Sequence, residues 1–101
     1  MIYITQFIFL KEGQEDVFQQ FEALAIPILY KYNGLLLLRV RPTEASFIES
    51  RIEKPYEIHL VSFDSEVDFE NFKRDEERKA FLHLKEQSIK ATLTIKGVSL
   101  G

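Results

Sequence analysis

The sequence has no cysteine and no tryptophan, and it contains only four glycines and three prolines. The absence of cysteine excludes disulfides, thiolate nucleophiles and thiolate metal sites. There is no low-complexity tract, and 46% of the residues are hydrophobic, which argues against a disordered chain. The apolar run Leu35–Leu38 is far too short to span a bilayer. We therefore expect one globular domain over residues 1–101.

An excess of positive charge is also missing, because the net charge is −3. An acidic surface repels phosphate backbones, so we expect no nucleic-acid partner. The opening stretch MIYITQFIFL lacks the preceding basic region and the following small-residue cleavage site of a secretory signal. The sequence also lacks a glycine-rich phosphate loop, a G-x-S-x-G motif and an H-E-x-x-H motif. We expect a cytoplasmic protein that does not bind membranes.

Six segments have a recognisable periodicity. Segments rich in β-branched, aromatic or alternating apolar residues predict strands at 2–10, 35–41, 56–63 and 91–97. Apolar residues at helical spacing predict helices within 14–32 and 65–88, the first kinked at Pro27 and the second interrupted by the polar run 74–79. Ser65, with Asp68 three residues later, resembles a capping box at the start of the second helical region. The order βαββαβ is typical of a ferredoxin-like α+β domain, with a four-stranded antiparallel sheet and two helices on one face.

Side chains along a strand alternate between the two faces of a sheet, so each strand divides into two sets. One set is nearly all aliphatic, and we expect it beneath the helices: Ile2, Ile4, Ile8, Leu10, Leu36, Leu38, Val40, Ile58, Leu60, Leu93 and Ile95. The other set mixes apolar and polar side chains, and we expect it on the uncovered face: Tyr3, Thr5, Phe7, Phe9, Leu35, Leu37, Arg39, Arg41, Glu57, His59, Val61, Phe63, Thr92, Thr94 and Lys96. A face with this many apolar side chains is suited either to a homodimer with sheet packed on sheet or to an open platform for bases.

Glu57 and His59 lie two residues apart in the third predicted strand. His59 is a candidate general base, and Glu57 is a candidate carboxylate beside it. Same-face neighbours along a strand are roughly 6–7 Å apart, which is long for a direct hydrogen bond. Glu57 therefore has two candidate partners, His59 and Arg39. The alternative role for His59 is structural, with its hydrogen bonds satisfied inside the protein.

Four further side chains are candidates for binding a ligand beside this pair: Tyr3, Thr5, Arg39 and Thr94. An arginine binds a carboxylate ligand bidentately. Arg39 and its neighbour Arg41 are equally able to pair with acidic residues such as Glu57 across a dimer. The ligand expected from this set is a small anionic or aromatic molecule.

Metal and RNA sites are disfavoured by the sequence. His83 and Glu86 have the spacing of a ligand pair on a helix, but a third ligand is missing, so we expect no metal and no cofactor. The segment IYITQF is similar to the first aromatic strand motif of the RNA-recognition fold. The third strand, however, has Glu57 where a positive charge is needed, and it contains no glycine.

Three features together resemble a known family: YKYNG at the end of the first helix, a third strand that ends in Phe63 ahead of a helix, and the segment DEERKAFLHLKE. They are similar to the family called domain of unknown function 1330, in the dimeric α+β barrel superfamily. The resemblance implies a homodimer with a cavity between sheet and helices. That family has no agreed activity. The chain also lacks the Asn-Trp-Trp pattern of the quinone-forming monooxygenases in the same superfamily.

From these observations we expect a small ligand-binding protein or a cofactor-independent enzyme. In the enzyme, His59 moves a proton, Arg39 anchors an anionic group and Glu57 orients one of them. The alternatives are a non-catalytic dimer whose polar interior is satisfied internally and, less favoured, an open-sheet nucleic-acid module.

Overall fold

The computed structural model describes residues 1–101. Its strands are β1 (Ile2–Leu10), β2 (Gly34–Val40), β3 (Glu57–Phe63) and β4 (Ile89–Gly97). Its α-helices are α1 (Glu15–Ala25), α2 (Glu66–Lys73), α3 (Glu76–Lys79) and α4 (Leu82–Ser88), and two short 3-10 helices are η1 (Ile26–Tyr32) and η2 (Glu44–Ser46). Every predicted element is present, and the last strand begins two residues earlier than expected.

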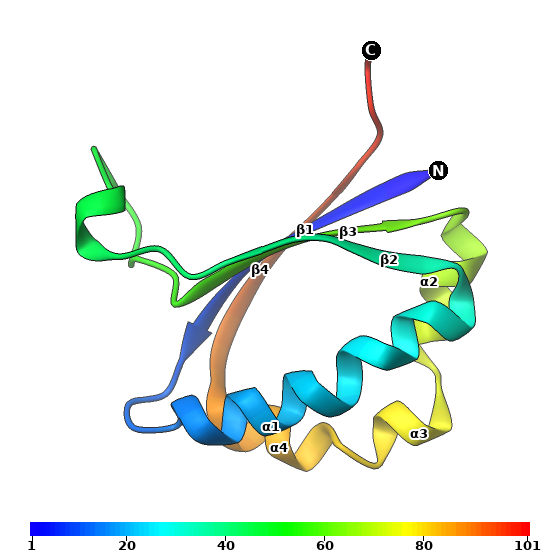
Figure 1. Ribbon diagram of the computed structural model, residues 1–101, viewed down its shortest axis with the longest axis horizontal. Helices are drawn as coiled ribbons and strands as arrows, with labels where there is room; N and C mark the ends of the chain where they lie inside the picture. Colours follow the sequence, from blue (N-terminus) through cyan, green and yellow to red (C-terminus); the bar gives the residue numbers. More distant parts are fainter.

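The strands form one antiparallel sheet in the order β2-β3-β1-β4. All the α-helices lie on one side of this sheet, and no helix covers the other side (Figure 1). The connection between β2 and β3 extends past the end of the sheet (Figure 1). This is the predicted ferredoxin-like α+β fold. No helix has both the length and the hydrophobicity that a membrane crossing requires.

The kink predicted at Pro27 is confirmed as a change of helix type. Helix α1 ends at Ala25 and η1 begins at once, with Pro27 in its first turn, where a missing N–H costs least. Asn33 ends η1 in the left-handed conformation, at φ 56°. A Cβ atom at Gly34 would lie 2.8 Å from a ring carbon of Phe63, so only glycine allows η1 and β3 to approach this closely.

The second helical region is divided by its own capping residues. The hydroxyl of Ser65 accepts a hydrogen bond from the Asp68 N–H at 3.2 Å, as the sequence predicted for an N-cap. A carboxylate oxygen of Asp75 accepts one from the Arg78 N–H at 2.8 Å and begins α3. This new cap within the polar run separates α3 from α2, whereas α4 begins after Phe81 without a side-chain cap.

The hydrophobic core lies between the helices and the β1–β3 half of the sheet. Its centre is Ile4, Leu29, Val61 and Phe63, all at most 8% exposed. Two phenylalanines of α2 cover Phe63, with ring centroids 5.3 and 5.6 Å away. Each fully buried side chain of this size contributes about 1.5–3 kcal/mol through removal of apolar surface from water.

The face predicted for Glu57 and His59 was wrong. Gln6 of β1 pairs with His59, and Ile8 pairs with Glu57, so these side chains share one face. That face is the one beneath the helices, because Ile8, Glu57 and His59 are only 1–3% exposed. Val61 and Phe63 follow at every second position of the strand, so they lie on the same face and belong to the core.

The predicted faces of β2 were also reversed from mid-strand onward, and those of β4 were reversed throughout. The β2–β3 register shifts between Leu36 and Leu38, which places Arg39 beside His59 and turns Leu38 to the other side. In β4, Thr94 pairs with Gln6, so it too lies on the helix side. The prediction placed a nearly all-aliphatic set beneath the helices, whereas the helices also cover a set of mutually bonded polar groups.

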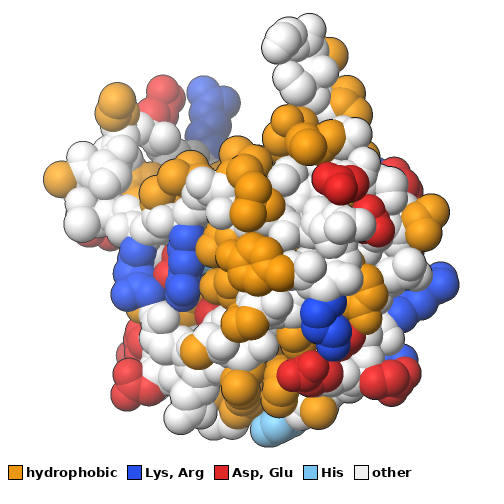
Figure 2. Space-filling model, turned by 45° about the vertical axis from the view of Figure 1, so that its right-hand side comes forward, with side chains coloured by type: hydrophobic (Ala, Val, Ile, Leu, Met, Phe, Trp, Pro, Cys, Tyr) orange, Lys and Arg blue, Asp and Glu red, His pale blue; other side chains and the backbone are white.

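The face without helices is almost entirely apolar. We call it the open face, and it consists of Tyr3, Thr5, Phe7, Phe9, Leu35, Leu38, Val40, Ile58, Leu60, Ser62, Ala91, Leu93 and Ile95. Five of its aliphatic side chains are 38–51% exposed in the single chain. In Figure 2, hydrophobic side chains run from the upper edge of the molecule into the middle of the view, while acidic and basic groups are interspersed without a continuous region of either sign.

Candidate functional site

A buried carboxylate at the start of β3 gathers three cationic or imidazole partners. One oxygen of Glu57 accepts hydrogen bonds from Arg39 Nε at 2.8 Å and from His59 Nε2 at 2.5 Å. The other oxygen accepts from Arg41 Nη2 at 2.7 Å and from Arg41 Nε at 3.2 Å. Both predicted partners of Glu57 are therefore correct at once. The expectation that an i, i+2 pair is too far apart failed because the two side chains bend toward each other along the strand.

Elements on three sides hold this cluster in place. Arg39 Nη2 also donates to the side-chain oxygen of Gln19 on α1, at 3.1 Å. The Arg41 guanidinium stacks on the ring of Tyr56, with its carbon 4.7 Å from the ring centroid. The two arginines link β2 to α1 and to the start of β3, and they fix the direction of the Glu57 carboxylate.

The electrostatics of the cluster keep Glu57 ionised. Burial by itself raises the pKa of Glu57, but the hydrogen bonds from His59, Arg39 and Arg41 outweigh it and lower that pKa to about 2. An ionised carboxylate accepts hydrogen bonds and cannot donate them. The hydrogen between His59 and Glu57 therefore belongs to Nε2 of the imidazole.

The other ring nitrogen of His59 has no hydrogen-bond partner in the protein. Every fully enclosed side-chain nitrogen or oxygen in the structure has a partner, so this Nδ1 atom is in contact with open space. When the ring is neutral, Nδ1 holds the lone pair. His59 thus has one nitrogen fixed by a carboxylate and a basic nitrogen that is free.

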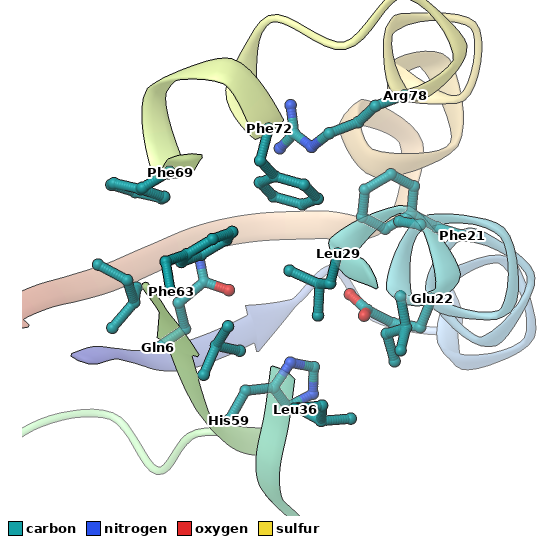
Figure 3. Close-up of a pocket in the computed structure, with 14 residues that line it drawn as sticks. Gln6, Phe21, Glu22, Leu29, Leu36, His59, Phe63, Phe69, Phe72 and Arg78 are labelled. Carbon is teal, nitrogen blue, oxygen red and sulfur yellow. The ribbon is translucent and has the colours of Figure 1, made fainter. Parts of the chain in front are cut away.

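That open space is a cavity of about 80 Å³ between the sheet and the helices. Its apolar wall includes four phenylalanines: Phe21, Phe63, Phe69 and Phe72. Its polar lining comes from four side chains on four elements: Gln6 of β1, Glu22 of α1, His59 of β3 and Arg78 of α3. In Figure 3, the His59 ring and the Glu22 carboxyl group both point into the space enclosed by Leu29 and the aromatic rings.

Glu22 is a cavity residue that the sequence analysis missed. It is 7% exposed, and its carboxyl group makes no hydrogen bond and no ion pair. Burial raises the pKa of Glu22, and the charge of Glu57 adds to this, while His59, Arg39 and Arg78 act in the opposite direction. The available signal was its position, since Glu22 lies at i+4 from Phe18 on the buried stripe of α1.

Arg78 approaches the cavity from α3. Its guanidinium carbon lies 5.0 Å from the ring centroid of Phe72, and its only hydrogen bond from the guanidinium is a long one, 3.5 Å, to the Lys73 carbonyl oxygen. Burial lowers the pKa of Arg78. Most of its donors are therefore available to a ligand.

An ion cluster beside α3 holds this arginine in position. Asp75 is 5% exposed and accepts hydrogen bonds from the Tyr32 hydroxyl and from the Arg78 N–H, and it forms an ion pair of 2.9 Å with Lys31. The hydrogen bond from Tyr32, against the opposing effect of burial, is the main reason that the pKa of Asp75 falls to about 2. The cluster fastens the start of α3 to η1.

The structure divides the predicted site residues into three groups. Glu57, His59 and Arg39 are brought together by direct hydrogen bonds. Thr94 lies on the same face at the edge strand, where its hydroxyl accepts a 3.4 Å hydrogen bond from Gln6. Tyr3 and Thr5 lie on the open face, because their positions alternate with those of Ile4 and Gln6 along β1, so a single site that includes all six residues was a wrong expectation.

The second histidine lies outside this region. His83 is exposed on α4, and its Nδ1 atom is 3.1 Å from the Ala80 carbonyl oxygen. No group of three or more histidine or acidic side chains has the arrangement of a metal site.

Comparison with known proteins identifies the fold. No family model and no curated protein matches the sequence, so the narrower resemblance to the domain of unknown function 1330 family is not confirmed. The chain is similar to a structure of a protein of unknown function from Rhodopseudomonas palustris, with a TM-score of 0.83 and 11% identity over 99% of this chain and 82% of that chain.

Two further structures have informative names. A dabb family protein with a ferredoxin-like fold from Mesorhizobium loti has a TM-score of 0.69 and 18% identity, over 99% of this chain and 97% of that chain. A putative antibiotic biosynthesis monooxygenase from Nitrosomonas europaea has a TM-score of 0.73 and 8% identity, over the full length of both chains. At such identities the likeness establishes the fold, which is the ferredoxin-like α+β fold that these structures share.

Proposed function

We propose that this protein binds a small organic molecule in the cavity between sheet and helices, and that His59 moves a proton to or from that molecule without a cofactor. The observation that supports this most directly is the state of His59. Its Nε2–H is held by an ionised carboxylate, and its Nδ1 atom is open to the cavity. A general base needs a free nitrogen within reach of the substrate and a fixed ring orientation.

In this proposal Glu57 is a positioning residue and does not touch the ligand. It orients His59 and stabilises the imidazolium that forms when Nδ1 accepts a proton. Arg39 was expected to anchor an anionic ligand, but its Nε and Nη2 atoms already bond Glu57 and Gln19. Arg39 therefore acts through Glu57, and Arg78 takes the ligand-binding role.

The competing function is a non-catalytic dimer in which the polar interior satisfies itself. It accounts for Glu57, whose partners are all protein groups. It does not account for Glu22 and for Nδ1 of His59, which have no protein partner and face the same cavity. Both groups border the cavity, where a ligand can form hydrogen bonds with them.

A fragment screen by two-dimensional ¹H–¹⁵N NMR tests the proposed cavity. Small aromatic and aliphatic carboxylic acids are added to the wild type and to an Ala25→Leu variant, because Ala25 lines the cavity and is buried. We expect shifts confined to cavity residues in the wild type and their loss in the variant. An Ala45→Leu variant at an exposed position in η2 is the matched control. If no fragment shifts the cavity residues, or if the shifts persist in Ala25→Leu, the proposed site is wrong.

We also propose that two copies of the chain pack through their open faces as a homodimer. The face is mostly apolar, extends over four strands and exposes several aliphatic side chains to 38–51% in the single chain. Soluble monomers rarely expose a contiguous apolar surface of this kind. Nucleic acid is a poor alternative occupant, because Arg39 and Arg41 lie on the other face, where they bind Glu57.

A further inference from the structure

The unpaired carboxyl group of Glu22 calls for a ligand-related role. It is more than nine-tenths buried, has no hydrogen bond, and borders the cavity that His59 also borders. An acidic side chain in this state is stabilised by holding its proton, as burial and the neighbouring Glu57 charge favour. The cavity thus has a proton donor and a proton acceptor, contributed by α1 and by β3.

The charge around the cavity favours an anionic ligand. Arg78 borders the cavity, and Arg39 and Arg41 bind Glu57 behind His59, so three arginines accompany two carboxyl groups, of which Glu22 favours the neutral form. Only Arg78 has free guanidinium donors that border the cavity. A carboxylate on the ligand would meet this guanidinium over the Phe72 ring.

The size of the cavity limits the rest of the ligand. A cavity of about 150 Å³ accommodates benzene, and this one measures about 80 Å³. With the carboxylate at Arg78, the enclosed part of the ligand has room for only a few non-hydrogen atoms. A carbonyl group with an adjacent C–H bond fits this space and can use both a proton donor and a proton acceptor.

We propose that Glu22 is the acid partner of His59, and that the cavity enolises a small 2-oxo carboxylate whose carboxylate group binds Arg78. This inference rests on the proposed function of the cavity and names its substrate class. It requires Glu22 and His59 to act on neighbouring atoms of one molecule, which agrees with their placement around one small space (Figure 3).

The step is a proton transfer that needs no further reactant. Nδ1 of His59 takes a proton from the carbon next to the carbonyl, and the electrons of that C–H bond form the carbon–carbon double bond of the enol. The former carbonyl electrons form a new O–H bond with the proton that Glu22 releases. The reverse reaction returns a proton from the imidazolium to carbon and a proton from the enol to Glu22.

Exchange of the methyl protons of pyruvate for deuterium tests the inference. Pyruvate is dissolved in D₂O with the protein, and the loss of its methyl proton signal is followed by NMR. We expect exchange above the buffer rate in the wild type and in His83→Gln, and exchange at the buffer rate in His59→Gln. Glu22→Gln keeps the size of the side chain but cannot release a proton, so its saturating rate should fall roughly 100-fold. Arg78→Gln should raise the pyruvate concentration for half-maximal exchange about tenfold, with a nearly unchanged saturating rate.

The outcomes separate this inference from the proposed function. If Glu22→Gln exchanges protons like the wild type while His59→Gln does not, the acid role of Glu22 is wrong and the base role of His59 stands. If pyruvate shifts the cavity resonances but neither the wild type nor any variant speeds the exchange of its methyl protons, the enolisation is wrong and the binding site stands. If pyruvate neither shifts the cavity resonances nor exchanges, while other carboxylic acids bind there, the substrate class is wrong.

Discussion

The two faces of the sheet differ from the distribution that a small α+β domain usually shows, in which the covered face is apolar and the exposed face is polar. Beside the hydrophobic core, the face beneath the helices holds the polar side chains of Glu57, His59, Arg39 and Gln6. The face exposed to solvent in the single chain holds almost only aliphatic and aromatic side chains. In the functions proposed above, the covered face binds a ligand and the open face packs against a second copy of the chain.

Disruption of the open face should have the largest effect. Leu38→Asp and Ile95→Asp each place a charge on the open face, at positions about half exposed in the single chain. Because a charge cannot be buried between two apolar sheets without a partner, we expect the solution mass to fall from that of two chains to that of one. Light scattering coupled to gel filtration measures this directly.

Val67→Asp is the control, since Val67 is 64% exposed on α2 and lies on the helix side of the sheet. Its mass should match that of the wild type. A wild type that is already a monomer at micromolar concentration would contradict the dimer and would leave the open face without the proposed occupant.

Removal of the buried carboxylate should have the next largest effect. Glu57→Ala leaves the His59 ring and two guanidinium groups without their common partner, so we expect the free energy of unfolding to fall by about 3 kcal/mol. Denaturant unfolding at neutral pH measures the loss. Arg51→Ala, at an exposed position in the connection between β2 and β3, should change the free energy of unfolding little.

The Glu57 carboxylate also makes the stability of the protein depend on pH. The pKa of Glu57 is about 2 in the folded protein, against an ordinary value of 4.5, so its contribution is complete above pH 4.5 and is lost as the pH falls toward 2. The difference in stability between wild type and Glu57→Gln should therefore shrink over this interval. A difference in stability that stays constant from pH 5 to pH 2 would show that these partners do not lower the pKa of Glu57.

Replacement of Glu22 should raise the free energy of unfolding, and by less than replacement of Glu57 lowers it. Burial raises the pKa of Glu22, so the folded protein binds this proton more tightly than the unfolded chain, and stability falls as the pH rises above 4.5. Glu22→Gln removes that cost. We expect a gain of about 1 kcal/mol at neutral pH that disappears in acid, measured by denaturant unfolding at several pH values. The groups that face Glu22 are His59, Glu57, Arg39 and Arg78, and a loss of stability would mean that one of the cations pairs with it in solution.

A stability change of similar size to that of Glu22→Gln, but of opposite sign, is expected at a position that serves only the fold. Ser65→Ala removes the cap of α2 and should cost about 1 kcal/mol, with no change in mass or in binding to the cavity. Ser99→Ala near the C-terminus is a neutral control. If Ser65→Ala changes fragment binding, the cap of α2 also positions the cavity residues of that helix.

The sequence predicted the elements well because their signals are local. The helical spacing of Phe18, Phe21 and Ala25, the kink at Pro27 and the cap at Ser65 each depend on residues within one or two turns. The βαββαβ order then gives the topology with few alternatives. These inferences need no knowledge of what lies across the sheet.

The faces of the strands could not be predicted in the same way, because they depend on register between segments far apart in the chain. A one-residue shift exchanges the two faces of a strand, and β2 contains such a shift between Leu36 and Leu38. The assumption that polar residues face solvent then placed His59 on the wrong side. Glu22 was missed because a glutamate on a helix is normally exposed, and only its phase relative to Phe18 indicated otherwise.

The tautomer of His59 tests the central claim most directly. A long-range ¹H–¹⁵N NMR spectrum of the neutral imidazole distinguishes a proton on Nε2 from one on Nδ1, and His83, the only other histidine, can be removed as His83→Gln for assignment. The hydrogen bond to Glu57 predicts that His59 has its proton on Nε2 and a bare Nδ1, and that Nδ1 shifts when a ligand enters the cavity. A proton on Nδ1 in the neutral ring would mean that the cavity faces no base and would contradict the account.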